Sequence, residues 1–290
     1  MIADGAPVVV LLSGGRDSVC LLHRAVQAGA RVTALHVNYG LRAEADEDER
    51  FCRALCERLG VPIVVERAEW DGTGNLQAWA REVRYAAAER LEGDIATGHT
   101  ATDQAETILY RLAASPGRRA LLGMAAREGR VIRPLLSLTR DDTARYCTEH
   151  GLEWREDPSN DSSAFARNRI REGLVRELRR VHPAAEANVI RTAELLREEA
   201  EVLDEVVETA LAGRDEMPLA TLAALPRALA RLIVRRLAED ATGHLCARAA
   251  GRTDDVLALT EGALDLGDGV RAEVKRGMLR MVRTPERSHA

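Results

Sequence analysis

The order of apolar segments in the first 113 residues constrains the fold more strongly than any other feature of this chain. Short β-rich runs alternate there with amphipathic helical stretches. Apolar periodicity predicts strands at 8–12, 32–37, 62–65 and 95–97 and helices at 18–28, 45–59, 76–91 and 102–113. This βαβ order predicts an α/β fold with a doubly wound parallel sheet, in which ligands bind at the carboxyl ends of the strands.

After residue 113 the pattern indicates the end of one part and a smaller second part. A strand at 131–136 and a helix at 139–150 belong to the first part, and a long amphipathic helix follows at 183–212. Beyond it the sequence predicts a helix at 225–239 and a β ribbon with strands at 270–274 and 278–282. We therefore expect a main domain at 1–182, a linker helix at 183–212, and a small, mostly helical C-terminal unit at 213–290 that ends in the β ribbon.

Composition excludes several classes of protein. Hydrophobic residues make up 46% of the chain and charged residues 30%, which is typical of a folded globular protein. No run of about eighteen apolar residues predicts a membrane span, and the first residues do not match a secretory signal, so we expect a cytoplasmic protein. The five cysteines are scattered without a C-x-x-C pair, which favours neither a disulfide framework nor a zinc site.

The basic residues are almost all of one kind. Of the 41 lysine and arginine residues, only Lys275 is lysine. Chemistry that needs a lysine near the amino end, such as a Walker-type phosphate loop, is therefore excluded. Arginine keeps its charge at physiological pH and binds phosphate through a planar fork, so the chain can still bind phosphates.

A glycine loop stands between the first predicted strand and the helix after it. The loop consists of Ser13, Gly14, Gly15, Arg16, Asp17 and Ser18. Its glycines let a ligand approach the backbone, its hydroxyls supply donors, and the amides of the new helix point to the same place. These features predict an anion-binding site, although a Gly-Ser sequence by itself is most often only a turn. We expect a methyl group at Gly14 to occupy the place where phosphate must approach.

The glycine loop resembles the pyrophosphate loop of the N-type ATP pyrophosphatases, the PP-loop superfamily. Those enzymes cleave ATP to AMP and pyrophosphate and adenylate an oxygen of their substrate. The resemblance implies that the loop binds the pyrophosphate part of ATP and that Mg2+ helps to neutralise its charge. It also implies that adenine lies beside the end of the second strand, at His36 and Asn38.

Longer motifs resemble the tRNA(Ile)-lysidine synthetases within that superfamily. The two main motifs are HVNYGLR at 36–42 and GHTATDQAET at 98–107, and shorter matches follow at 80–85, 117–124, 133–136, 156–160 and 165–171. The resemblance implies a ligase that acts on the wobble cytidine of a tRNA(Ile) with a CAU anticodon. ATP adenylates the C2 oxygen of that base, and the ε-amine of free L-lysine then displaces AMP to give lysidine.

The resemblance also assigns catalytic and metal-binding residues. The candidate catalytic residues are Asp17, His99, Asp103 and Glu106, and the candidate Mg2+ ligands are Asp17 and Asp103. A carboxylate near the lysine substrate would take the proton that its ammonium must lose before attack. Two alternatives stay open: Asp103 only caps the helix that follows it, and His99 makes only a structural hydrogen bond.

Two positions depart from the family pattern. The family usually has histidine where Tyr39 stands and aspartate where Thr102 stands. The loss of one carboxylate leaves Asp103 as the chief acidic residue of its motif. Glu106 lies three residues further along the same helix, on the same face.

A basic segment is the candidate surface for tRNA. Between residues 111 and 182 there are fifteen arginines and ten acidic residues, a net charge of +5 against −10 elsewhere. The candidate tRNA contacts are Arg42, Arg118, Arg167, Asn168, Arg169 and Arg171. The C-terminal unit at 213–290 is also expected to bind tRNA. An arginine-rich stretch taken alone is more often a solvated surface.

Other functions remain compatible with the motifs. A thiolase of the same superfamily would insert sulfur into tRNA, ordinarily with paired cysteines. A degenerate relative would bind ATP or tRNA without turnover, an interpretation that the threonine at position 102 suggests. The sequence leaves open whether the protein forms a homodimer.

Overall fold

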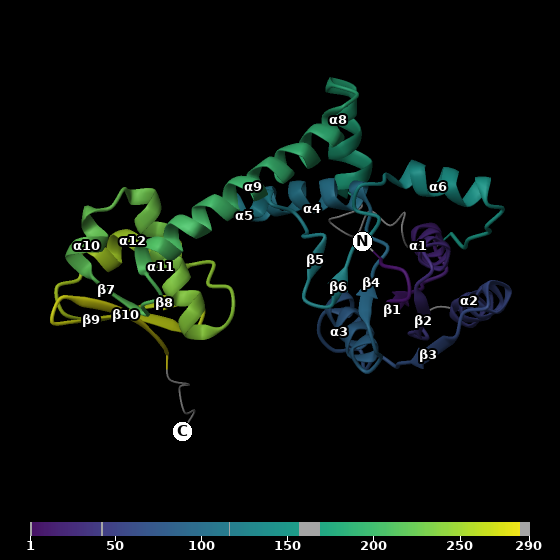
Figure 1. Cartoon of the computed structure of the whole chain (residues 1–290), viewed down its shortest axis with the longest axis horizontal. Coiled ribbons are helices and arrows are strands. Elements are labelled where there is room, and N and C mark those ends of the chain that lie inside the picture. Colours follow the sequence, from purple (N-terminus) through teal and green to yellow (C-terminus); the bar gives the residue numbers. More distant parts are fainter. Residues whose placement is uncertain (1, 42, 116, 157–168, 285–290) are drawn as a thin grey trace. The chain divides into compact units, whose positions relative to one another are not determined.

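The structure is a computed structural model in which residues 2–41, 43–115, 117–156 and 169–284 are described. The chain divides into two compact units, Met1–Leu196 and Arg197–Ala290 (Figure 1). The division falls inside one long helix, α9 (Ala185–Leu211), in the region where the sequence predicts a linker helix. Three of the expected tRNA contacts lie outside the described residues, namely Arg42, Arg167 and Asn168.

The first unit is built around a six-stranded sheet with the strand order β3-β2-β1-β4-β6-β5. Its strands are β1 (Pro7–Leu11), β2 (Arg31–Asn38), β3 (Ile63–Arg67), β4 (Asp94–Ala96), β5 (Arg127–Glu128) and β6 (Val131–Ile132). Neighbouring strands are parallel except for β5 and β6, which are antiparallel. The expected α/β fold with a mainly parallel sheet is therefore confirmed.

Helices cover both faces of this sheet, because its central strand is apolar on both sides. Before α9 the described helical elements are α1 (Arg16–Gln27), α2 (Ala45–Leu59), α3 (Leu76–Glu89), α4 (Ala101–Ala114), α5 (Arg118–Leu121), α6 (Arg140–Glu149), the π-helical η2 (Ile170–Val175) and α8 (Arg176–Val181). In β1, Val8 and Val10 join a core with α1 and α2, whereas Val9 and Leu11 join a second core with α3. The sheet is doubly wound, as the βαβ order predicts.

One strand is shorter than the sequence indicates. The apolar run favours a strand at 131–136, but β6 ends at Ile132. Pro134 has no amide hydrogen to donate to a neighbouring strand. Arg133 is buried beside it and donates from Nη1 to the Ala125 carbonyl at 2.7 Å. The chain therefore leaves the sheet at this point and leads on to α6.

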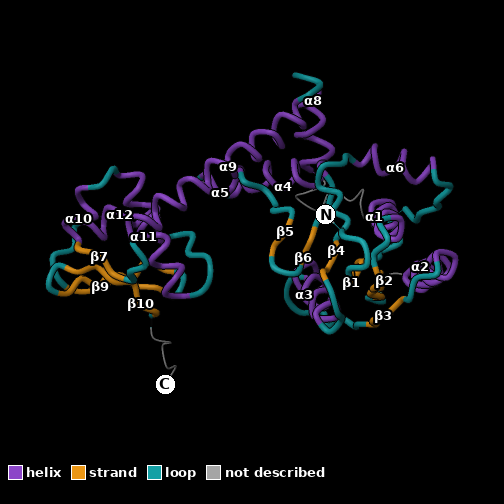
Figure 2. The backbone as a smooth tube through the Cα atoms, in the orientation of Figure 1, coloured by secondary structure: helices purple, strands orange, loops and turns teal. Residues whose placement is uncertain are grey.

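The second unit contains a four-stranded antiparallel sheet with the order β7-β10-β9-β8 (Figure 2). Its elements are β7 (Glu216–Pro218), α10 (Leu219–Ala224), α11 (Arg227–Thr242), the 3-10 helix η3 (Ala249–Arg252), α12 (Thr253–Leu257), β8 (Gly262–Gly267), β9 (Val270–Lys275) and β10 (Met278–Arg283). Ile233 and Leu237 of α11 share one buried apolar core with Val270 and Leu279 of the sheet. Among the described residues, no helix is both long enough and apolar enough to cross a membrane.

The expected β ribbon is confirmed as part of this larger sheet. Lys275 pairs with Met278, and the two residues between them, Arg276 and Gly277, both have positive φ values, 50° and 73°. Two-residue turns of this kind match the twist of antiparallel strands. The sequence did not indicate β7 or β8, because β7 has only three residues and β8 is largely exposed, so neither shows a clear apolar alternation.

Candidate functional site

A cavity of about 650 Å³ opens at the carboxyl ends of β1, β2 and β4. A doubly wound sheet binds its ligands at this edge, and the volume is usual for a small-molecule site. The glycine loop, the residues after β2 and β4, and parts of α6 and η2 line the cavity. Its charged lining residues are Arg16, Asp17, Arg84, Asp103, Arg140, Arg155, Glu156, Arg171 and Glu172.

The glycine loop is curled by its own hydroxyl groups. Ser18 Oγ donates to the Gly15 carbonyl at 2.7 Å and accepts from the Ser13 amide at 3.2 Å. Helix α1 begins at Arg16, so its amino end, with its partial positive charge, lies at the cavity. Of the six loop residues, all except Gly14 line the cavity. The loop therefore has the geometry of an anion-binding site.

Gly14 has a different role from the expected one. Its φ is +86°, and a Cβ added there would lie 3.4 Å from both Phe51 Cδ1 and Cys52 Sγ on α2. The expectation that a methyl group at Gly14 would block phosphate is therefore wrong, because the methyl group would point toward α2. The Gly14 carbonyl accepts a hydrogen bond from the Arg155 amide at 2.9 Å, which ties the loop to the chain after α6.

A second glycine, Gly98, lets the chain after β4 pack against the glycine loop. A Cβ at this position would lie 3.2 Å from the Asp17 carbonyl carbon and from the Ser18 amide nitrogen. Such contacts are tighter than most real Cβ contacts, so the backbone of the glycine loop would have to shift by a few tenths of an ångström. The motif at 98–107 therefore begins with a residue whose missing side chain brings two cavity walls together.

Alternate residues of β2 and the residue after it face the cavity. Leu35, Val37 and Tyr39 line it, whereas His36 and Asn38, the expected neighbours of adenine, do not. The side chains of His36 and Asn38 are 4% and 5% exposed and point to the other side of the strand. Leu35 and Val37 thus form an apolar part of the cavity wall.

His36 supports the glycine loop from behind. Its Nδ1 donates to the Leu12 carbonyl at 2.9 Å, because a carbonyl can only accept. Among the described residues, Nε2 is buried without a hydrogen-bond partner. Burial lowers the pKa of His36, so the ring is neutral at pH 7. Asn38 donates to Asp46 Oδ1 at 2.9 Å and Glu49 Oε2 at 3.1 Å, which anchors α2 beside the same strand.

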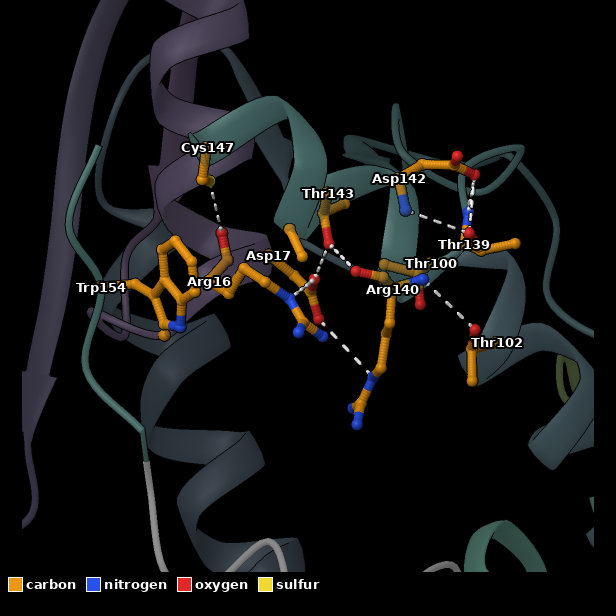
Figure 3. Close-up of polar contacts among 12 residues, drawn as sticks. Arg16, Asp17, Thr100, Thr102, Thr139, Arg140, Asp142, Thr143, Cys147 and Trp154 are labelled. Carbon is orange, nitrogen blue, oxygen red and sulfur yellow. Dashed lines mark hydrogen bonds and ion pairs between the residues drawn. The ribbon is translucent and has the colours of Figure 1, made fainter. Parts of the chain in front are cut away.

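The two expected metal ligands meet at one arginine. Arg140 Nε lies 3.7 Å from Asp17 Oδ2 (Figure 3), and its Nη2 lies 3.3 Å from Asp103 Oδ1. Asp17 Oδ1 accepts a short hydrogen bond of 2.5 Å from Thr143 Oγ1 on α6. Asp17 and Asp103 come from α1 and α4, so the fold brings together carboxylates that are 86 residues apart in the sequence.

Asp103 also caps α4. Its Oδ2 accepts from the Thr100 amide and from Thr100 Oγ1, both at 2.8 Å, and its own amide donates to Thr100 Oγ1 at 3.4 Å. This reciprocal pattern is a capping box. The helix-capping alternative is therefore true of Oδ2, while Oδ1 remains directed at Arg140.

Glu106 and His99 differ in their access to the cavity. Glu106 is 1% exposed and does not line the cavity, and Arg171 donates to both of its oxygens at 2.6 and 3.2 Å. Arg171 itself lines the cavity, so Arg171 lies between Glu106 and the cavity. His99 lines the cavity directly, with Nδ1 2.7 Å from Thr97 Oγ1.

Comparison with known proteins agrees with this geometry. Residues 3–178, more than half of the chain, match the family model described as the PP-loop domain. The chain belongs to the PP-loop family. It is 39% identical over 247 residues to the tRNA(Ile)-lysidine synthase of Thermus thermophilus, covering 82% of this chain and 48% of that protein. It is 37% identical over 284 residues to the tRNA(Ile)-lysidine synthase of Solibacter usitatus, covering 92% of this chain and 64% of that protein.

These comparisons confirm the resemblance to the tRNA(Ile)-lysidine synthetases. The PP-loop chain spans about half to two thirds of the length of these two relatives. Among solved structures it resembles the U34-tRNA thiolase NcsA from Methanococcus maripaludis with its [4Fe-4S] cluster. The TM-score is 0.57 with 19% identity, over 68% of this chain and 73% of that one. At that identity the likeness shows the fold alone.

The two departures from the family pattern have definite partners in this PP-loop domain. Thr102 Oγ1 accepts from the Arg140 amide at 3.4 Å, which joins the amino ends of α4 and α6 (Figure 3). The Tyr39 hydroxyl donates to the Ala80 carbonyl at 2.9 Å and accepts from Arg84 Nε at 3.1 Å. Both residues therefore support walls of the cavity.

Three of the five arginines that line the cavity were not predicted from the sequence. Arg16 and Arg171 were assigned, whereas Arg84, Arg140 and Arg155 were not. Arg84 lies in the matched motif at 80–85, which was a usable signal. Arg140 and Arg155 follow the glycine loop by more than 100 residues, and no local pattern marks them. The other described arginines assigned to tRNA, Arg118 and Arg169, do not line the cavity.

Asp17 and Asp103 fit a magnesium ion only together with other donors. Within the described ranges, no group of three or more His, Cys, Asp or Glu residues could hold a metal. Mg2+ usually binds through one or two carboxylates together with substrate phosphates and water. Two carboxylate oxygens in the wall of an anion-binding cavity match that set of donors.

Proposed function

We propose that this protein is a tRNA(Ile)-lysidine synthetase, a ligase that forms a carbon–nitrogen bond. With ATP it would adenylate the C2 oxygen of the wobble cytidine in a CAU anticodon, releasing pyrophosphate. The ε-amine of free L-lysine would then attack C2, and AMP would leave with the original C2 oxygen. The observation that carries the proposal is a cavity with an anion-binding loop and five arginines, in a chain 39% identical to a tRNA(Ile)-lysidine synthase.

The cavity divides into a part suited to phosphate and a part suited to a base. The Ser13 hydroxyl and the amino end of α1 would bind the β and γ phosphates, with Arg16 beside them, while Ser18 keeps the loop curled through its bonds to Gly15 and Ser13. Leu35 and Val37 give an apolar surface for adenine. Mg2+ carried by the nucleotide would be held at Asp17 and Asp103, where it would neutralise phosphate charge.

The amine-transfer step needs a proton acceptor. The lysine ammonium must lose a proton before its nitrogen can attack C2. Asp103 lines the cavity, and its Oδ1 would be available once Mg2+ has left with pyrophosphate, so Asp103 is the acceptor that we propose. Glu106 is occupied by Arg171, and we assign it the positioning of that arginine. His99 lies on the same wall, where it would contact the phosphate or the cytidine.

The tRNA would approach over the arginine-rich segment of the first unit. Arg118 and Arg169 lie outside the cavity, where they can bind backbone phosphates beyond the reacting base. The second unit is a separate packed body, and we propose that it binds tRNA as well. Phosphate contacts of this kind give binding that weakens steeply with salt.

Thiolation is the competing activity, and the cysteines count against it. All five cysteines are free and buried, and none lines the cavity. Burial raises the pKa of Cys52 and raises that of Cys56 to about 11, so neither thiol is a ready nucleophile. The hydrogen bond with Cys20 lowers the pKa of Cys147, but this thiol is also buried and does not line the cavity, so sulfur transfer through the chain's own thiols is not favoured.

Mass spectrometry of tRNA after incubation with ATP and lysine tests the proposal. A tRNA(Ile) transcript with a CAU anticodon should gain the mass of one lysine less one water, and a transcript with uridine at the wobble position should not. Asp17→Ala should abolish the gain. AMP release without lysine incorporation would favour another nucleophile, and a complete lack of AMP release would favour the degenerate ATP- or tRNA-binding alternative.

A further inference from the structure

One guanidinium lies between the two carboxylates of the cavity. Arg140 is within 3.7 Å of Asp17 and 3.3 Å of Asp103, and its side chain is 27% exposed. Two carboxylates that share one cavity wall repel each other unless a cation lies between them. In the free protein Arg140 is the cation beside both carboxylates, and Arg16 Nε lies 3.4 Å from the other oxygen of Asp17, Oδ1.

Each carboxylate has one oxygen fixed and one oxygen directed at Arg140. Thr143 Oγ1 donates to Asp17 Oδ1, and Thr100 holds Asp103 Oδ2. The remaining oxygens are Asp17 Oδ2 and Asp103 Oδ1, and both lie beside the guanidinium. Both oxygens are therefore already positioned for any cation that replaces the arginine.

The side chain of Arg140 makes weaker contacts than the backbone around it. Within the described chain, Arg140 Nε is buried and makes no hydrogen bond, and its distance to Asp17 is that of an ion pair only. In contrast, the amino end of α6 is fixed by the Thr139–Asp142 capping box and by the bond from the Arg140 amide to Thr102 Oγ1. Figure 3 shows the Arg140 side chain extending from the amino end of α6 toward Asp17, so a rotation of this side chain alone would take it away from the carboxylates.

We infer that Arg140 is a built-in counter-cation, which holds the place between Asp17 and Asp103 until nucleotide-bound magnesium displaces it. The displaced guanidinium stays within the cavity, where it is free to bind phosphate. The inference rests on the proposed assignment of Asp17 and Asp103 to the metal. It explains why a pair of acidic residues can stay close together before any ligand arrives.

Manganese binding to the protein without nucleotide or tRNA tests this inference. Free Mn2+ measured by electron paramagnetic resonance should show weak binding to the unaltered protein. Arg140→Gln removes the competing charge, so Mn2+ should bind about tenfold tighter or more. Arg140→Lys keeps the charge and should bind Mn2+ weakly. Arg145→Gln is the matched control, because Arg145 lies on the same helix but pairs with Asp142 outside the cavity.

A second set of measurements distinguishes this role of Arg140 from a purely structural one, because two affinities should change in opposite directions. In Arg140→Gln the affinity for Mn·ATP should fall, because a phosphate-binding cation is lost, while the affinity for Mn2+ alone rises. Adding Asp103→Asn to Arg140→Gln should remove the gain in Mn2+ binding. Unchanged or weaker Mn2+ binding in a folded Arg140→Gln, checked by circular dichroism, would overturn the inference. Since no tRNA or lysine is present, that result leaves the proposed ligase activity to its own test.

Discussion

The two units of the chain differ most in what they bury. Among the described residues, the buried polar and charged side chains lie in the first unit, with the exceptions of Thr242 and Thr253. Every phenylalanine, tryptophan and tyrosine of the sequence also lies in the first unit. The second unit is held together by aliphatic side chains such as Ile233 and Leu279.

The difference follows from the cavity. A buried polar group costs free energy unless it is hydrogen-bonded, and a buried charge costs more unless it is paired. In the first unit, groups such as Glu106 with Arg171 satisfy each other around the glycine loop. Polar burial in this protein therefore marks the unit that carries the candidate site, and the second unit has a core that is almost entirely apolar.

Breaking the buried ion pair should have the largest effect on stability. Glu106→Ala leaves Arg171 without its partner and should lower the free energy of unfolding of the first unit by about 3–5 kcal/mol. The matched control is Asp94→Ala, which breaks an exposed two-point pair with Arg127 and should cost about 1 kcal/mol or less. Tryptophan fluorescence in urea follows the first unit, where all three tryptophans lie. Equal losses in the two variants would contradict a special role for polar burial.

Variants of two aspartates that cap helices distinguish an effect on catalysis from an effect on helix stability. Asp103 and Asp142 accept the same pair of bonds, from Thr100 on α4 and from Thr139 on α6, but only Asp103 lines the cavity. Asp103→Asn should reduce lysidine formation by about 10²-fold, the scale of lost acid–base help, whereas Asp142→Asn should leave it nearly unchanged. Both variants should lose similar, small amounts of stability. Near-normal turnover in Asp103→Asn would leave Asp103 with its capping role alone.

Two buried threonines test whether the two units have separate roles. Thr143 donates to a cavity carboxylate, Asp17, whereas Thr242 of the second unit donates to the Ala238 carbonyl of its own helix. Thr143→Val should lower AMP release by about tenfold, because a hydrogen bond to a charged group is lost. Thr242→Val should leave AMP release unchanged. A similar loss of activity in both variants would show that the units do not divide the work in this way.

The smallest effect expected is a pH dependence of the first unit. Burial lowers the pKa of both His23 and His36 from the ordinary value near 6.5. The unfolded chain then binds more protons than the folded one below about pH 6.5, so stability is complete above that pH and falls as the pH drops. Urea midpoints followed by tryptophan fluorescence at about pH 7.5 and about pH 5.5 measure the change. His36→Asn should reduce the difference, and a midpoint that rises on acidification would contradict it.

Much of the fold could be predicted from the sequence, because periodicity records which faces are buried. The helix predicted at 45–59 matches α2 (Ala45–Leu59) at both ends, and the first strands agree within a residue or two. A helix cap at Asp103 was one of the alternatives from the sequence, and the second capping box has the same Thr-x-x-Asp pattern at 139–142. These features depend on neighbours in the sequence, so local patterns reveal them.

The site was only partly predictable, because it depends on partners far apart in the chain. The glycine loop could be recognised from its sequence alone. In contrast, β2 is apolar on both faces, so its pattern did not show that Val37 faces the cavity and His36 faces away. Arg140 reaches Asp17 across more than 120 residues. Gly14 illustrates the same limit, since only the packing of α2 shows where an added methyl group would point.

The arginines of the cavity affect which amine can attack the activated cytidine. In the proposed reaction the adenylated cytidine is an electrophile that must wait for the amine of a free lysine. A protein lysine in the wall would be an amine of the same kind and would compete for C2. The five guanidinium groups that line the cavity supply positive charge and stay protonated, while the single lysine of the chain, Lys275, lies in β9 of the second unit. The wall is thus strongly attractive to phosphate and inert toward the activated base.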